Sequence, residues 1–143
     1  MKIFNNKNLT KKELRLLFCI LAKEQGVSKV IFSKFGKDVG GSYSAHKKTI
    51  FIDTKETKVG SLRIMFHELA HHVATKMNLW KEYHFDLVNN LSWEEIFDIE
   101  NGVDKLGEKL WNKYVDISQW GRYKYGYPKS RKKIIIETFL SKR

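Results

Sequence analysis

Two histidines and a glutamate stand close together near the middle of the chain. His67 and His71 are four residues apart, and Glu68 follows His67 directly, in the pattern His-Glu-x-x-His. One helical turn separates the two histidines, so both imidazoles project from one face and can bind the same tetrahedral zinc ion. Glu68 lies beside them, where its carboxylate can accept a proton from an activated water molecule. The sequence therefore predicts a helix that carries a catalytic zinc site.

The residues around this motif predict that the helix is amphipathic and covers residues 61–78. Its apolar positions share one face; they are Leu62, Phe66, Leu69, Ala70, Val73 and Met77. Unpaired imidazoles and a carboxylate would be costly on a partly buried face, so the motif is expected to have a bound partner. His72 points about 100° away from His71 around the helix, and we expect it to face solvent or to be hydrogen-bonded.

A catalytic zinc site usually has three protein ligands, so one more is expected downstream of His71. The candidates are His84, Glu94, Glu95 and Glu100. A capping box of Ser92 and Glu95 predicts a second helix that runs to about Tyr114. With about 100° per residue, Glu100 lies at the edge of the apolar stripe of that helix, Glu94 lies on the solvent side and Glu95 is marginal. Glu100 is the favoured third ligand, with the other three left as alternatives.

Two further residues of this second helix bear on the site. Asp104 follows Glu100 by one turn and is placed to accept a hydrogen bond from the outer nitrogen of His67 or His71. Gly107 costs helix stability by roughly 1 kcal/mol relative to alanine. We expect this glycine where the second helix approaches the motif helix closely.

The elements that must position these residues lie upstream. Thr10 and Glu13 form a capping box that opens a helix over residues 11–25, and Val27–Phe35 and Thr49–Asp53 have the composition of two strands. Gly36, Gly40 and Gly41 predict a turn between the strands. A last apolar cluster at 134–140 fits either a helix or a strand. The pattern predicts an α+β fold with an N-terminal helix, a small sheet, the motif helix, the glutamate helix and a basic C-terminal segment.

Length and composition predict a single domain over residues 1–143. The chain is 42% hydrophobic with one proline, which argues against disorder and against a proline-rich linker. Cys19 is the single cysteine, and we expect it to be buried within the apolar run Leu16–Ala22. That run is too short to cross a membrane and is not followed by a cleavage site, so we expect an intracellular, cytoplasmic protein with no membrane partner.

The charge is unevenly distributed. The formal net charge is +11, with +8 in residues 1–60, −4 in residues 61–117 and +7 in residues 118–143. Carboxylates thus gather around the predicted metal site, between two basic flanks. Residues 120–133 interleave aromatic rings with Lys and Arg, a composition that suits contact with nucleic acid as well as packing of the rings on the domain.

The chain from Thr10 to Tyr114 resembles the zincin metallopeptidases, and in particular the small gluzincins of the minigluzincin and phage-associated types. In that branch a glutamate on a second helix follows His-Glu-x-x-His and opens a Glu-x-x-x-Asp pattern, which Glu100 to Asp104 match, with Val103 where the family usually has a smaller residue. The resemblance implies a compact zincin-like fold in which His67, His71 and Glu100 hold one zinc ion and Glu68 is the general base for peptide-bond hydrolysis. Its partner would be a protein or peptide substrate, and we expect a monomer.

A second resemblance, to the Spartan-like (SprT) proteases, implies His84 as the third ligand and an association with DNA. A catalytically inactive, zinc-stabilised module that binds nucleic acid is the remaining alternative. Under the peptidase hypothesis, we expect the substrate backbone to pair with the Thr49–Asp53 strand. A group that stabilises the developing oxyanion is also needed, and the candidates are His46, Tyr43, Tyr123, Tyr125 and Tyr127.

Overall fold

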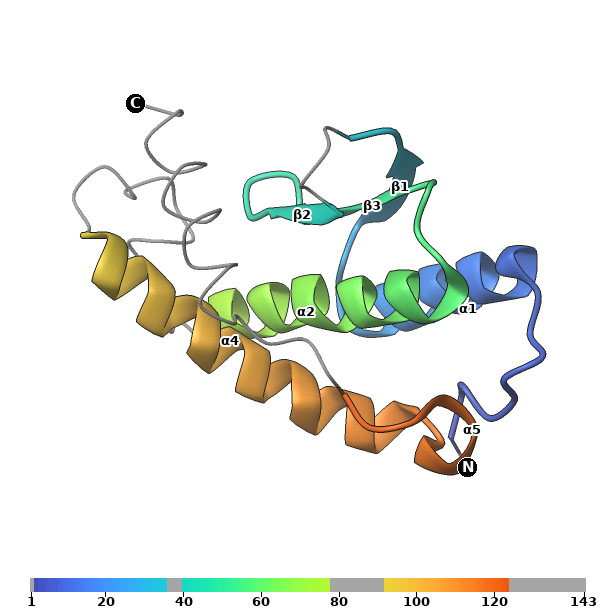
Figure 1. The fold of residues 1–143 in the computed structure, drawn as a ribbon. Helices are drawn as coiled ribbons and strands as arrows, with labels where there is room; N and C mark the ends of the chain where they lie inside the picture. Colours follow the sequence, from blue (N-terminus) through green and yellow to red (C-terminus); the bar gives the residue numbers. More distant parts are fainter. Residues whose placement is uncertain (1, 36–39, 78–91, 124–143) are drawn as a thin grey trace.

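The computed structural model describes residues 2–35, 40–77 and 92–123 of the protein (Figure 1). In chain order the elements are α1 (Lys11–Glu24), β1 (Lys29–Ser33), β2 (Gly41–Ser44), β3 (Thr49–Asp53), α2 (Lys58–Lys76), α4 (Trp93–Tyr114) and the short α5 (Ile117–Trp120). The fold is of the α+β class, as the sequence predicts. His84 and the cluster at 134–140 lie outside the described residues. In the described part of the chain, no helix is long and apolar enough to cross a membrane.

The first helix begins and ends where local signals place it. The Thr10 hydroxyl accepts a hydrogen bond from the Glu13 amide, and the Glu13 carboxylate accepts one from the Thr10 amide, both at 3.1 Å. Gly26, with a φ of 83°, follows the last turn and ends the helix before β1 begins. Leu14, Phe18, Leu21 and Ala22 form the buried face.

Cys19 is exposed, so the expectation that it is buried is wrong. The apolar run that contains it extends around the whole circumference of α1, and only one face of the helix packs on the core. Leu16 and Ile20, on the same outer side, are 62% and 48% exposed.

The sheet has three strands in the order β1, β3, β2, with β1 parallel and β2 antiparallel to β3. The sequence predicts β3 with its observed bounds, but it predicts β1 too long and misses β2, because Gly40 and Gly41 are typical of a turn. Since β1 and β2 occupy both edges of β3, the expectation that a substrate pairs with Thr49–Asp53 is also wrong. Within the described chain, β2 pairs with β3 alone.

Helix α2 lies at the centre of the molecule, where it packs against α1, α4, β2 and β3 (Figure 1). Thr57 caps it by accepting a hydrogen bond from the Gly60 amide at 3.1 Å, so the helix begins three residues earlier than predicted. Ile50 and Ile52 of β3 and Leu62, Met65 and Leu69 of α2 are fully buried between these elements. The sheet thus covers one side of α2 and α4 lies along another.

Helix α4 runs beside α2 and carries the residues that the sequence places near the motif. Its capping box forms as predicted, with Ser92 and Glu95 exchanging two hydrogen bonds of 3.2 Å. A Cβ atom at Gly107 would lie 3.4 Å from the carbonyl oxygen of Phe66 and 2.9 Å from the hydroxyl of Tyr123. The expectation that Gly107 marks a close approach of the two helices is confirmed.

Candidate metal centre

The three motif residues lie on α2 and are almost completely buried. The exposed fractions are 2% for His67, 6% for Glu68 and 6% for His71. One potential ligand atom from each of the three lies within 4.8 Å of the other two. This buried group of two imidazoles and a carboxylate could hold a metal ion, which the spacing of the motif predicts.

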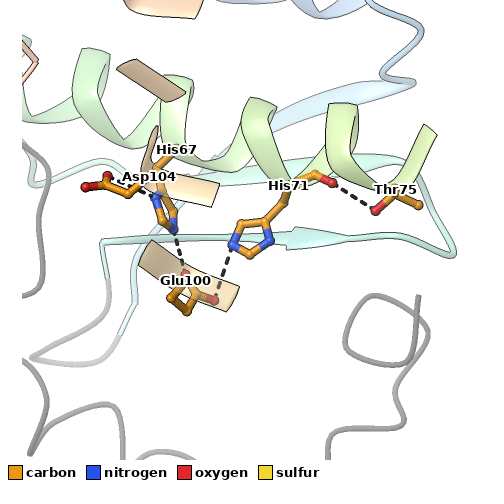
Figure 2. Close-up of polar contacts among 5 residues, drawn as sticks. All are labelled: His67, His71, Thr75, Glu100 and Asp104. Carbon is orange, nitrogen blue, oxygen red and sulfur yellow. Dashed lines mark hydrogen bonds and ion pairs between the residues drawn. The ribbon is translucent and has the colours of Figure 1, made fainter. Parts of the chain in front are cut away.

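Glu100 of α4 contacts both imidazoles (Figure 2). Its Oε2 lies 3.0 Å from Nε2 of His67, and its Oε1 lies 3.3 Å from Nε2 of His71. Glu100 is 7% exposed, whereas Glu94 and Glu95 are exposed. Of the three glutamates considered from the sequence, Glu100 is the one that the structure brings to the histidines, and its place at the edge of the apolar stripe of α4 explains why.

The donor set and its spacing are compatible with a tetrahedrally coordinated metal ion. Ligand atoms about 2.0–2.2 Å from a tetrahedral zinc ion lie about 3.3–3.6 Å from one another. The observed separations of 3.0 Å and 3.3 Å between the Glu100 oxygens and the two imidazole nitrogens approach this range. Two imidazoles and a carboxylate are also a ligand set that leaves the fourth position of a zinc site open for water. Glu68 belongs to the same group, but Glu100 is the carboxylate that contacts both ring nitrogens directly.

Asp104 adjoins the other ring nitrogen of His67 (Figure 2). Its Oδ1 lies 3.7 Å from Nδ1 of His67, one turn along α4 from Glu100. At this distance the contact is an ion pair and not the hydrogen bond expected from the sequence, and it favours positive charge on the imidazole. Of the two histidines considered as partners of Asp104 from the sequence, the structure places His67 there.

The buried charges of the centre depend on one another. Burial by itself lowers the pKa of His67, but the nearby carboxylates of Asp104, Glu100 and Glu68 offset this effect and raise that pKa to about 10. Burial would likewise raise the pKa of Glu100, yet the charges and hydrogen bonds of His71 and His67 hold that pKa well below its ordinary value. The centre therefore favours an ionised Glu100 and attracts positive charge between α2 and α4.

Glu68 lies on the side of α2 that faces β2. A Cβ atom at Gly41 would lie 3.7 Å from Cγ of Glu68, so the two residues are neighbours. Burial raises the pKa of Glu68, and the adjacent imidazoles of His67 and His71 act in the opposite direction. A buried carboxylate with a raised pKa is suited to accept a proton and to release it again.

His72 is buried and hydrogen-bonded, so the solvent-facing alternative of the sequence-based expectation is wrong and the hydrogen-bonded one is confirmed. It is 2% exposed. Its Nδ1 lies 2.7 Å from the Tyr43 hydroxyl and its Nε2 lies 2.8 Å from the carbonyl oxygen of Gln25. Burial lowers the pKa of His72, which favours the neutral ring. Neither contact could be predicted, because both partners come from other elements.

Several residues that the sequence offers for oxyanion stabilisation or nucleic-acid contact have other partners in the structure. Tyr43 is held by His72, and burial raises its pKa to about 12. Tyr123 packs on Trp111, with ring centroids 5.6 Å apart, and Trp120 is buried. These two rings of the basic aromatic segment therefore pack on the domain. His46 is exposed in the turn between β2 and β3, and Tyr125, Tyr127 and the rest of that segment lie outside the described residues.

No protein-family model matches the chain, and a comparison with curated proteins found no match. The arrangement of the centre itself is therefore what indicates a function.

Proposed function

We propose that the protein is a zinc-dependent metallopeptidase of the gluzincin type. The observation that carries this proposal is the contact of Glu100 with both imidazoles of the motif, at 3.0 Å and 3.3 Å, next to a buried Glu68. A structural ion pair would need neither the second histidine nor the adjacent glutamate. The three ligands with an open fourth position are what a hydrolytic zinc site requires.

Each residue of the centre has a separate role in the proposed hydrolysis. His67, His71 and Glu100 hold the metal, and Asp104 orients His67 through its outer ring nitrogen. When bound, zinc polarises a water molecule and the scissile carbonyl group. Glu68 accepts a proton from the attacking water and passes it to the nitrogen of the leaving amine. No covalent bond to the protein forms, so no nucleophilic side chain is needed.

The sheet offers a place for the substrate backbone. Strand β2 pairs on one side with β3 and, within the described residues, with no strand on its other side. An extended peptide can add to such an edge through main-chain hydrogen bonds. Because Gly41 of β2 adjoins Glu68, a peptide along this edge would pass close to the general base. We therefore propose β2, and not β3, as the strand that binds substrate.

A comparison of wild type with Glu68→Gln tests the proposal. Both proteins are loaded with zinc and incubated with denatured casein and with a mixture of proteome-derived peptides, and the products are mapped by mass spectrometry. We expect cleavage by the wild type, loss of cleavage by a chelator and its return with zinc. Glu68→Gln should keep its zinc and lose about 10²- to 10⁴-fold in rate, because the general base is missing.

Glu94→Gln is the matched control, because Glu94 is exposed on α4 and makes no contact with the centre in the described structure. It should cleave at the wild-type rate. Cleavage by Glu68→Gln at that same rate would refute the role of Glu68. A zinc-loaded wild type that cleaves neither substrate would refute the proposed activity.

A further inference from the structure

The proposed reaction makes no use of His72, although this residue is among the most buried polar groups of the protein. Both of its ring nitrogens have partners. Nε2 lies 2.8 Å from the Gln25 carbonyl oxygen, which can only accept, so Nε2 carries a proton. Nδ1 lies 2.7 Å from the Tyr43 hydroxyl, and the two rings meet edge to face with centroids 5.6 Å apart. His72 thus joins β2 to the end of α1 across α2.

The face of α2 beneath β2 consists of Ile64, Glu68 and His72, which are four residues apart and lie in one row. Gly41 rests on the first part of this row: a Cβ there would lie 2.4 Å from Cγ2 of Ile64 and 3.7 Å from Cγ of Glu68. Tyr43, two residues along the strand on the same side, is held by His72. Strand β2 is therefore attached to α2 on both sides of Glu68.

The two attachments differ in kind. At Gly41 the strand is held by close packing, because a side chain cannot fit between the backbone of β2 and Ile64. At Tyr43 the strand is held by a hydrogen bond from the tyrosine hydroxyl to Nδ1 of His72. The second hydrogen bond of His72, to the Gln25 carbonyl oxygen, fixes the orientation of the imidazole ring. Together they set how far β2 lies above α2 and which of its residues face Glu68. The hydrogen bond between Tyr43 and His72 constrains the orientation of the strand, which apolar packing alone does not do.

We propose that His72 is a positioning residue: through Tyr43 it fixes the edge strand β2 over Glu68, so that a peptide bound to this strand presents its scissile bond to the general base. This inference rests on the proposed peptidase function. His72 does not touch the substrate, and its effect is exerted on where the substrate backbone is bound. Removing the Tyr43 contact should weaken peptide binding and leave the chemical step nearly unchanged, which appears as a raised KM with kcat preserved.

The test compares two variants that each lose one tyrosine hydroxyl. Tyr43→Phe removes the contact with His72, whereas Tyr114→Phe removes a hydrogen bond of similar length, 2.8 Å, that the Gln25 side chain donates at the end of α4. The substrate is a fluorogenic peptide built on a cleavage site of the wild type. We expect Tyr43→Phe to raise KM about 5- to 10-fold with kcat within about threefold, and Tyr114→Phe to leave both constants at wild-type values.

Two substitutions at His72 each remove one of its two hydrogen bonds and keep the other. The amide of His72→Asn takes the place of Nδ1 and can still accept from Tyr43, whereas the amide of His72→Gln takes the place of Nε2 and can reach Gln25 alone. His72→Gln should raise KM as much as Tyr43→Phe does, and the double variant should be no worse than either single one. His72→Asn should raise KM less than His72→Gln does, because it keeps the contact with Tyr43 and loses the bond to Gln25. All variants should keep one zinc per chain.

The possible outcomes distinguish this role from the proposed function. A wild type that binds zinc and cleaves no peptide overturns the peptidase function and this role with it. A wild type that cleaves, together with equal KM values for Tyr43→Phe and Tyr114→Phe, overturns the role of His72 alone. Additive effects of Tyr43→Phe and His72→Gln would also overturn it, because the two residues would then act independently.

Discussion

His67 is the residue at which proton binding and metal binding compete most directly. The carboxylates of Asp104, Glu100 and Glu68 offset the effect of burial and raise its pKa to about 10. A metal ion needs the lone pair of Nε2, so it must displace the proton that this nitrogen shares with Glu100. The same carboxylates that favour the protonated ring also favour a bound cation. Binding of the metal ion therefore replaces the proton on His67.

This competition predicts that zinc affinity rises with pH. Between pH 7 and pH 8.5, which lies above the ordinary pKa of histidine and below the raised pKa of His67, zinc binding should release about one proton, and affinity should increase about tenfold per pH unit. Calorimetric titration of the chelator-treated protein in two buffers of different ionisation enthalpy measures the number of protons released. A pH-independent affinity would contradict the coupling of His67 to its carboxylates.

Asp104 should contribute to metal affinity without contacting the metal. Asp104→Asn removes the charge that lies 3.7 Å from Nδ1 of His67, and we expect zinc to bind about 10- to 100-fold more weakly. Competition with a chromophoric chelator measures the change. Asp98→Asn is the control on the same helix, because Asp98 is exposed. Equal affinities of the two variants would show that Asp104 does not support the ligand.

At the scale of the elements, α2 uses two of its faces for different tasks. One face turns His67 and His71 toward Glu100 of α4, and the other places Glu68 and His72 beneath β2. About two turns of one helix, over residues 64–72, thus connect the ligands, the general base and the strand that we propose to bind substrate. The position of β2 depends on Gly41, whose backbone lies directly against Ile64 and Phe51.

Gly41→Ala should therefore destabilise the protein. The added Cβ would lie 2.4 Å from Cγ2 of Ile64 and 2.7 Å from the carbonyl oxygen of Phe51, and the backbone oxygen cannot move without disturbing the β2–β3 pairing. We expect a loss of about 1–3 kcal/mol in the free energy of unfolding, measured by denaturant titration. Ser42→Ala, at the next and exposed position, should change it by less than about 0.5 kcal/mol. Equal stability of the two variants would contradict the close packing of β2 on α2.

Local signals explain which elements could be predicted from the sequence. The capping boxes of Thr10 with Glu13 and of Ser92 with Glu95 fix the starts of α1 and α4, and both form as predicted. The position of Glu100 follows from the apolar periodicity of a helix whose bounds were predicted well. Strand β2 could not be predicted, because the local sequence around Gly41 is typical of a turn. The reason for a glycine there is the close approach of Ile64 on α2, which the sequence does not reveal. The contacts of His72 and the exposure of Cys19 likewise depend on which faces pack together.

At the scale of the whole molecule, the N-terminal segment joins α1, α2 and α4. Phe4 is completely buried, and its ring contacts Phe18 of α1 and Phe66 of α2, with centroids 5.7 Å apart in both pairs. Its backbone accepts a hydrogen bond from the Asp116 amide and donates one to the Tyr114 carbonyl oxygen, each 3.0 Å long. The arrangement of α2 and α4, on which the metal centre depends, is therefore supported at Phe66, the residue before His67, and at the C-terminal end of α4.

Phe4→Ala should lower the free energy of unfolding by about 3–5 kcal/mol, because it removes a buried ring from the contact of three helices. Leu16→Ala is the control, since Leu16 is 62% exposed on the outer face of α1 and should matter little. Thermal and denaturant unfolding of both variants measure the difference. A Phe4 variant as stable as the Leu16 variant would show that the N-terminal segment does not support the core.

The zinc content of the purified protein decides whether His67, His71 and Glu100 hold a metal ion. Elemental analysis of wild type, Glu100→Gln, Glu94→Gln and His84→Ala compares the proposed ligand with an exposed glutamate on the same helix and with the alternative histidine. We predict about one zinc ion per chain in wild type, Glu94→Gln and His84→Ala, and a nearly complete loss in Glu100→Gln, which leaves the site two protein ligands. Loss of zinc in His84→Ala alone would favour the Spartan-like alternative, and a wild type without zinc even after reconstitution would refute a metal site at these residues.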